Sequence, residues 1–102
     1  MIESNLSKDR AAEIDANVHH VFRKHYINSV PCGYSLSDDG LWFFEYHVRV
    51  TWPRRMNADK IFDEIMTVFR ERGVKKLSGH GFGYVGDGWW FFHFHVLPNL
   101  AE

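Results

Sequence analysis

The chain has 102 residues, a length that favours one domain, residues 1–102, with a single modest core. Hydrophobic residues make up 45% of the chain and aromatic residues 17%, a composition that excludes intrinsic disorder. The formal net charge of -1 excludes a global positive field that would attract nucleic acid or an anionic membrane. With one cysteine, Cys32, the chain cannot form an internal disulfide framework.

The N-terminal residues contain neither the basic nor the apolar segment of a signal peptide. No apolar run approaches the roughly 20 residues that a membrane helix needs. We therefore expect a cytoplasmic protein that does not enter a membrane.

The first predicted helix spans residues 7–28. Ser7 is a suitable N-cap, and Pro31 prevents the helix from continuing. Apolar residues recur at steps of three and four along one face, namely Ala11, Ile14, Val18, Val21 and Phe22. This periodicity predicts that one stripe of the helix packs on the core.

A β-hairpin is predicted after this helix. Its strand, turn and second strand are expected at residues 33–37, 38–40 and 41–52. Asp39 and Gly40 favour a two-residue turn, because a tight hairpin turn needs positive φ values.

The second half of the chain predicts the same elements again. Asn57 can cap a helix over residues 58–72, Met56 and Ile61 can form a hydrophobic staple, and Gly73 suits the helix end. A second hairpin is expected next, with its strand, turn and strand at residues 81–85, 86–88 and 89–96.

The two long predicted strands resemble each other at an offset of 48 residues. Residues 41–48 read LWFFEYHV and residues 89–96 read WWFFHFHV, and each segment follows an Asp-Gly pair. The helices share the motif Val-Phe-Arg at an offset of 47 residues. This order of matches indicates a duplicated αββ unit, with repeats at about 7–52 and 57–96.

The fold class predicted from these elements is α+β. Two αββ units favour a four-stranded antiparallel sheet with both helices on one face. This connectivity resembles a circularly permuted ferredoxin-like arrangement, in which the last strand takes the place of the usual first one.

Alternation along the long strands divides their side chains between two faces. The inward set is apolar apart from one tyrosine hydroxyl: Trp42, Phe44, Tyr46, Val48, Val50, Trp90, Phe92, Phe94 and Val96. The outward set mixes aromatic and titratable groups, and its predicted binding residues are Phe43, Glu45, His47, Arg49, Trp89, Phe91, His93 and His95.

Two-residue turns would also fix the neighbours of these residues on the short strands. The outward partners would be Leu36 with Phe43, Tyr34 with Glu45, Cys32 with His47, Tyr84 with Phe91, Phe82 with His93 and His80 with His95. The small residues Gly33, Ser35, Gly81 and Gly83 would then face the helices. A three-residue turn would shift this register and exchange these neighbours.

Three chemistries remain open for the outward face. The first is a metal site, because cysteine and histidine are preferred zinc ligands, and its candidates are Cys32, His47, His80 and His95. The spacing of these residues matches no established zinc pattern, so ordinary polar surface is the favoured interpretation.

The second chemistry is acid–base catalysis by Glu45 with His47, His93 or His95, because a carboxylate beside an imidazole can tune the pKa of the ring. The chain has neither a phosphate-binding glycine loop nor a nucleophile elbow. A surface ion pair is therefore favoured over an enzyme, and the sequence implies no cofactor.

The third chemistry is binding, and it is the leading hypothesis. An exposed aromatic patch with an arginine at its edge is typical of protein interfaces. We predict a small regulator or inhibitor that docks a protein, or a second copy of itself as a homodimer, by occlusion or bridging. Single-stranded nucleic acid is the alternative, because bases stack on sheet aromatics. Arg49 is the only basic residue of the predicted face apart from histidine, although Arg54, Arg55, Lys75 and Lys76 could contribute at its rim.

Overall fold

The computed structural model describes residues 6–27, 33–50, 57–74 and 77–96. Within these residues the chain has an αββαββ order, as predicted. Its elements are α1 (Lys8–Lys24), β1 (Tyr34–Leu36), β2 (Trp42–Arg49), α2 (Ala58–Glu71), β3 (Gly79–Gly86) and β4 (Trp89–Val96).

Side-chain caps begin both helices at the predicted residues. Ser7 Oγ accepts a hydrogen bond from the Arg10 amide at 3.0 Å, and Asn57 Oδ1 accepts one from the Lys60 amide at 3.1 Å. Each bond satisfies an amide that has no partner within its own helix. The staple predicted from Met56 lies outside the described residues.

The two helices end in left-handed backbone geometry. Gly73 has a φ of +91° just after α2, as its position predicts. Tyr26 has a φ of 65° near the end of α1, which stops at Lys24 rather than near residue 28. The first helix is therefore shorter than the periodicity and Pro31 alone indicate.

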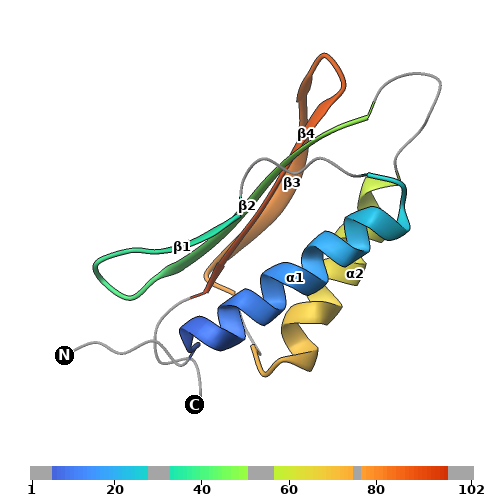
Figure 1. Cartoon of the computed structure of the whole chain (residues 1–102). Helices are drawn as coiled ribbons and strands as arrows, with labels where there is room; N and C mark the ends of the chain where they lie inside the picture. The colour runs from blue at the N-terminus through green and yellow to red at the C-terminus, as the bar shows by residue number, and fades with distance from the viewer. Residues whose placement is uncertain (1–5, 28–32, 51–56, 75–76, 97–102) are drawn as a thin grey trace.

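The described strands form one antiparallel sheet in the order β1-β2-β4-β3. β2 and β4 are the central strands and pair along their whole length, from Trp42 opposite Val96 to Arg49 opposite Trp89. Both helices lie side by side on one face of this sheet (Figure 1). The opposite face of β2 and β4 carries no described helix.

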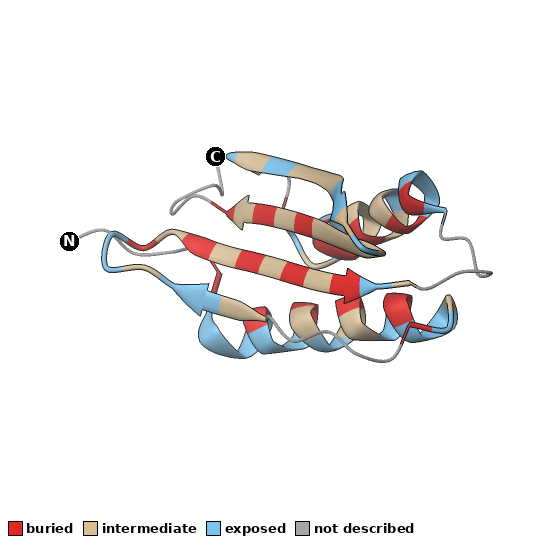
Figure 2. Ribbon diagram, turned by 90° about the horizontal axis from the view of Figure 1, so that it is seen from above, coloured by how far each residue is buried: buried red, intermediate tan, exposed pale blue. Residues whose placement is uncertain are grey.

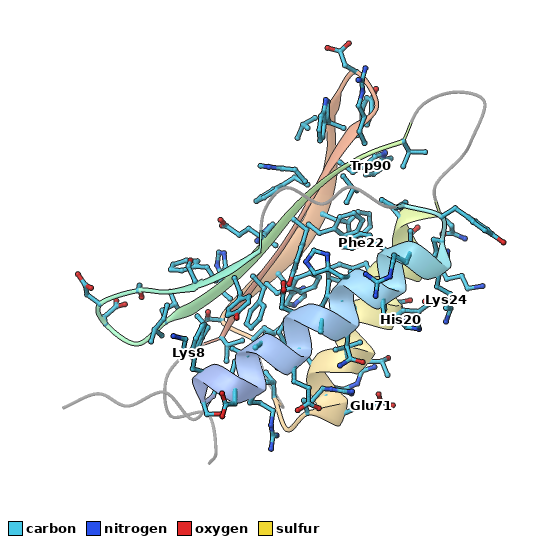
Figure 3. All side chains as sticks on the ribbon, in the orientation of Figure 1. Lys8, His20, Phe22, Lys24, Glu71 and Trp90 are labelled. Carbon is cyan, nitrogen blue, oxygen red and sulfur yellow. The ribbon has the colours of Figure 1, made fainter. Side chains whose placement is uncertain are left out.

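The core lies between the helices and the inward residues of the two central strands. Burial alternates along β2 and β4, as the stripes in Figure 2 show. Phe44 packs edge-on against Phe69 of α2, with ring centroids 5.0 Å apart. Figure 3 shows Phe22 of α1 reaching towards the sheet, where its ring centroid lies 5.5 Å from that of Phe92. The predicted inward set on the described residues of β2 and β4 is therefore confirmed, with Trp90 and Val50 only partly buried.

Tyr46 brings a hydroxyl group into the core. Tyr46 is completely buried, and its hydroxyl donates a hydrogen bond to Asp15 Oδ1 of α1 at 2.8 Å. Burial raises the pKa of this hydroxyl, and the Asp15 carboxylate raises it further. The bond satisfies a hydroxyl that would otherwise be costly inside an aromatic core.

The predicted register of the first hairpin is wrong by one residue. Its loop has three residues rather than two, because the Ser37 amide bonds to the Leu41 carbonyl at 2.9 Å around Gly40, whose φ is 85°. Tyr34 consequently lies opposite Phe44 on the helix side, and Ser35 lies opposite Phe43. The predicted pairs of Leu36 with Phe43 and Tyr34 with Glu45 do not form. Cys32 lies outside the described residues.

In the second hairpin the strand predicted at residues 89–96 is confirmed as β4, but the predicted register holds only next to the turn. Asp87 and Gly88 both have positive φ values and form the predicted two-residue turn, with Gly86 opposite Trp89. A β-bulge between Tyr84 and Gly86 then shifts the register by one residue.

This bulge reverses the predicted faces of β3. Phe82 and Tyr84 lie opposite Phe92 and Trp90, and Phe82 packs against the core. The glycines of β3 lie on the face away from the helices. The partners that were predicted on β3 for Phe91, His93 and His95 of β4 are therefore wrong. In the structure these partners are Gly83, Gly81 and Gly79, respectively.

Candidate functional site

The face of β2 and β4 that points away from the helices is called the outer face. The structure places all eight predicted binding residues on it, in four directly opposed rows: Phe43 with His95, Glu45 with His93, His47 with Phe91, and Arg49 with Trp89. Because β2 and β4 are neighbours, these side chains form one continuous surface.

Two rows of the outer face each combine a phenyl ring with an imidazole. The ring centroids of Phe43 and His95 lie 4.7 Å apart, and those of His47 and Phe91 lie 4.6 Å apart. Phe91 also stacks on His93, with centroids 5.4 Å apart and ring planes 16° apart. The rings therefore support one another as a packed layer.

This mutual packing leaves the aromatic side chains half-buried. Phe43, Trp89 and Phe91 are all of intermediate exposure, less exposed than the sequence pattern indicates. By contrast, Tyr26 is 75% exposed and Tyr84 is 57% exposed, and neither belongs to the outer face. The outer face is an ordered surface of rings rather than a set of protruding side chains.

Glycines of β3 make room for the imidazoles of β4. A Cβ atom at Gly81 would lie 3.0 Å from His93 Nε2, and one at Gly79 would lie 3.3 Å from His95 Nδ1. Each imidazole therefore lies across a position that lacks a side chain. This role of the glycines was not predicted, because a two-residue turn without a bulge would place Gly81 and Gly83 on the inward face. Their alternation with Phe82 and Tyr84 was the available signal.

The charged centre of the outer face consists of Glu45, His93 and His95. His95 Nε2 lies 3.6 Å from Glu45 Oε2, which is an ion pair when the ring is protonated but too long for a hydrogen bond. This nitrogen is buried and has no hydrogen-bond partner among the described residues. Partial burial lowers the pKa of His93 below 6.5, and His95 and His80 lower it further, whereas Glu45 opposes the shift.

Arg49 lies at the edge of this surface and holds the second hairpin. Its Nε donates a hydrogen bond to the Asp87 carbonyl at 3.1 Å, and its guanidinium lies 5.9 Å from the Trp89 ring centroid. The predicted edge arginine therefore also has a structural task at the turn. Arg54, Arg55, Lys75 and Lys76 lie outside the described residues.

The structure does not bring the described metal candidates together. His80 lies opposite Phe94 and contacts Phe62 of α2, so it points to the helix side, away from His95 and His47. His47 and His95 lie two rows apart on the outer face. In the described part of the chain, no three His, Cys, Asp or Glu residues are grouped to hold a metal ion. Cys32 is outside that part.

No protein family, curated protein or solved structure matches this chain. Among the described residues, neither helix combines the length and the apolar character needed to cross a membrane. The interpretation of the outer face therefore depends on its own geometry.

Proposed function

We propose that this chain is a small non-enzymatic interaction protein that binds a macromolecular partner, a protein or a second copy of itself, through the outer face. It would act by occlusion or bridging, as a regulator or inhibitor in the cytoplasm. The observation that supports this proposal is the continuous layer of side chains on β2 and β4, mostly aromatic and imidazole rings around Glu45, on the face opposite the helices.

The chemistry of this layer fits a protein surface. Aromatic residues and arginine are enriched at the centres of protein interfaces, because they bury a large area and still offer polar groups. Rings that already support one another lose little conformational freedom on binding, which lowers the entropic cost of association.

Single-stranded nucleic acid is the second candidate. The parallel rings of Phe91 and His93 could support a base by stacking. Phosphates, however, require several nearby cations, and Arg49 is already hydrogen-bonded to the Asp87 carbonyl. Among the described residues of β2 and β4, this shortage of cations on the outer face favours a protein partner.

We also propose that the chain is a duplicated αββ unit in a circularly permuted ferredoxin-like arrangement. Support comes from the outer face itself, where Phe43, Glu45 and His47 stand 48 residues before Phe91, His93 and His95. The duplication would explain why the two phenyl–imidazole rows resemble each other.

The proposed function is tested by measuring whether the Phe91→Asp variant still associates with itself or with another protein. The Tyr26→Asp variant is the matched control. Tyr26 is 75% exposed, lies after α1, and has a φ of 65° that aspartate tolerates. Sedimentation and affinity capture from cell extract would compare both variants with the parent chain. We expect Phe91→Asp to lose association while its circular dichroism spectrum stays unchanged, and Tyr26→Asp to retain association. Association that survives Phe91→Asp would contradict the proposal.

A further inference from the structure

Three of the four rows of the outer face, those of Phe43, Glu45 and His47, repeat about an axis perpendicular to the sheet. A rotation of 180° about the centre of the Glu45–His93 row exchanges β2 with β4 and places Phe43 on Phe91. The same rotation exchanges His47 with His95. Within these three rows each exchanged pair has the same chemistry except the central one, where a carboxylate replaces an imidazole. The Glu45 carboxylate at the centre is therefore the feature in which β2 differs from β4 within these rows.

The Glu45 carboxylate restricts what can cover this centre. Its side chain is 45% exposed, and its contact with His95 Nε2 at 3.6 Å is too long for a hydrogen bond. An apolar surface placed over it would leave a desolvated carboxylate without a donor, which is strongly unfavourable. The occupant must therefore present a hydrogen-bond donor or a positive charge above Glu45.

A second copy of the chain can supply that donor in one of two symmetric arrangements. Most homodimers have a two-fold axis, and stacked sheets keep their strands roughly aligned. If the axis runs across the strands, Glu45 lies over Glu45 of the other copy. If the axis runs along the strands, Glu45 lies over His93 of the other copy, and Phe43 lies over His95. Only the second arrangement pairs the carboxylate with a donor.

We infer that the partner of the outer face is a second copy of this chain, stacked with its two-fold axis along β2 and β4, so that Glu45 of each copy lies over His93 of the other. This inference rests on the proposed function, because it assigns an occupant to the same face. The Glu45–His93 row lies at the centre of the three inner rows, so a rotation of one stacked sheet relative to the other displaces it least.

The size of the face indicates how stable this dimer is. Three strands of eight residues and one of three, at about 3.3 Å per residue and about 4.8 Å between strands, give a four-stranded face of roughly 430 Å². Two stacked faces would bury roughly 860 Å², which is below the roughly 1,000 Å² of a stable specific interface and in the range of a weak one. The dimer should therefore dissociate on dilution.

Charge exchange at the central row tests the arrangement. Glu45→Lys places a lysine over His93 of the other copy, and His93→Glu places a glutamate over Glu45. We expect each single variant to raise the dimer dissociation constant about ten-fold or more, as measured by sedimentation equilibrium. The double variant Glu45→Lys, His93→Glu restores opposite charges between the copies and should return to within about three-fold of the parent chain.

A mixture of the two single variants separates contacts between copies from contacts within one chain. Glu45→Lys and His93→Glu chains should form a heterodimer, because each mutated residue then meets its opposite charge in the other copy. A double variant that stays as weak as the single variants would overturn the inferred arrangement.

Two different experimental outcomes distinguish a failure of this inference from a failure of the proposed function. A parent chain that stays monomeric at all concentrations, while Phe91→Asp still abolishes capture of a protein from extract, would overturn the second copy and leave the proposed function standing. If the Phe91→Asp variant associates as strongly as the parent chain, both the proposed function and the inferred dimer are overturned.

Discussion

Phe91 lies 4.6 Å from His47 across the two central strands, as measured between ring centroids, on the face of the sheet opposite α1 and α2. Its neighbour in the chain, Phe92, points the other way and is completely buried against α1. Two adjacent phenylalanines thus belong to opposite faces of one sheet, and they provide a matched pair for separating binding from folding.

Truncation of these two rings should have different effects on stability. Phe92→Ala leaves a cavity in the core and should lower the free energy of unfolding by about 3–5 kcal/mol. Phe91→Ala removes a half-buried ring and should cost about 1 kcal/mol. Urea denaturation followed by circular dichroism measures both values. Equal losses would show that Phe91 also belongs to the core.

The glycines of β3 offer a second matched pair. A Cβ atom at Gly81 would lie 3.0 Å from His93 Nε2, whereas one at Gly83 would meet no atom within 4 Å. Gly81→Ala should displace the His93 ring and lower the unfolding free energy by about 1 kcal/mol. Gly83→Ala should be neutral or raise it by about 0.5 kcal/mol, because alanine loses less backbone entropy on folding.

The imidazole resonances of His93 report this displacement directly in NMR spectra. We expect them to shift in Gly81→Ala and to stay in place in Gly83→Ala. The reverse result would mean that His93 does not lie across Gly81.

The buried hydroxyl of Tyr46 predicts a loss of stability on its removal. Tyr46→Phe leaves Asp15 without the hydrogen bond seen at 2.8 Å, and it should lower the unfolding free energy by about 1–2 kcal/mol. Asp15→Asn keeps an acceptor for the hydroxyl and should cost less. A Tyr46→Phe chain as stable as its parent would show that this bond contributes nothing to stability.

The histidine cluster predicts a pH dependence of stability. Because the pKa of His93 is lower in the folded chain than its ordinary value of 6.5, the unfolded chain binds more protons between the two values. Stability should therefore fall as the pH falls through 6.5 towards the folded pKa. Thermal denaturation at several pH values measures this slope, and His93→Gln should reduce it. A slope unchanged in His93→Gln would assign the effect to other groups.

The sequence predicts the outer face well along β2 and β4 but poorly along β1 and β3. In the long strands, the alternation of apolar and titratable residues separates the two faces without knowledge of any turn. In β1 and β3, the face of each residue depends on the register, and the register depends on the turn.

Local hydrogen bonds and backbone angles decide these two registers. Ser37 Oγ accepts a hydrogen bond from the Leu41 amide and donates one to the Leu41 carbonyl, which stabilises the three-residue loop. Gly86 has a φ of 108°, next to the bulge that reverses β3. An Asp-Gly pair indicates a turn in both hairpins, but it does not specify the loop length or a bulge beyond it.

The imidazole resonances of the seven histidines, recorded by NMR over a dilution series, test most directly that the outer face binds a second copy. We predict that the resonances of His47, His93 and His95 change with concentration. The other four should stay constant, because they lie on or after α1 and on the helix side of β3: His19, His20, His25 and His80. Changes confined to those four, or no change over the whole series, would contradict the account.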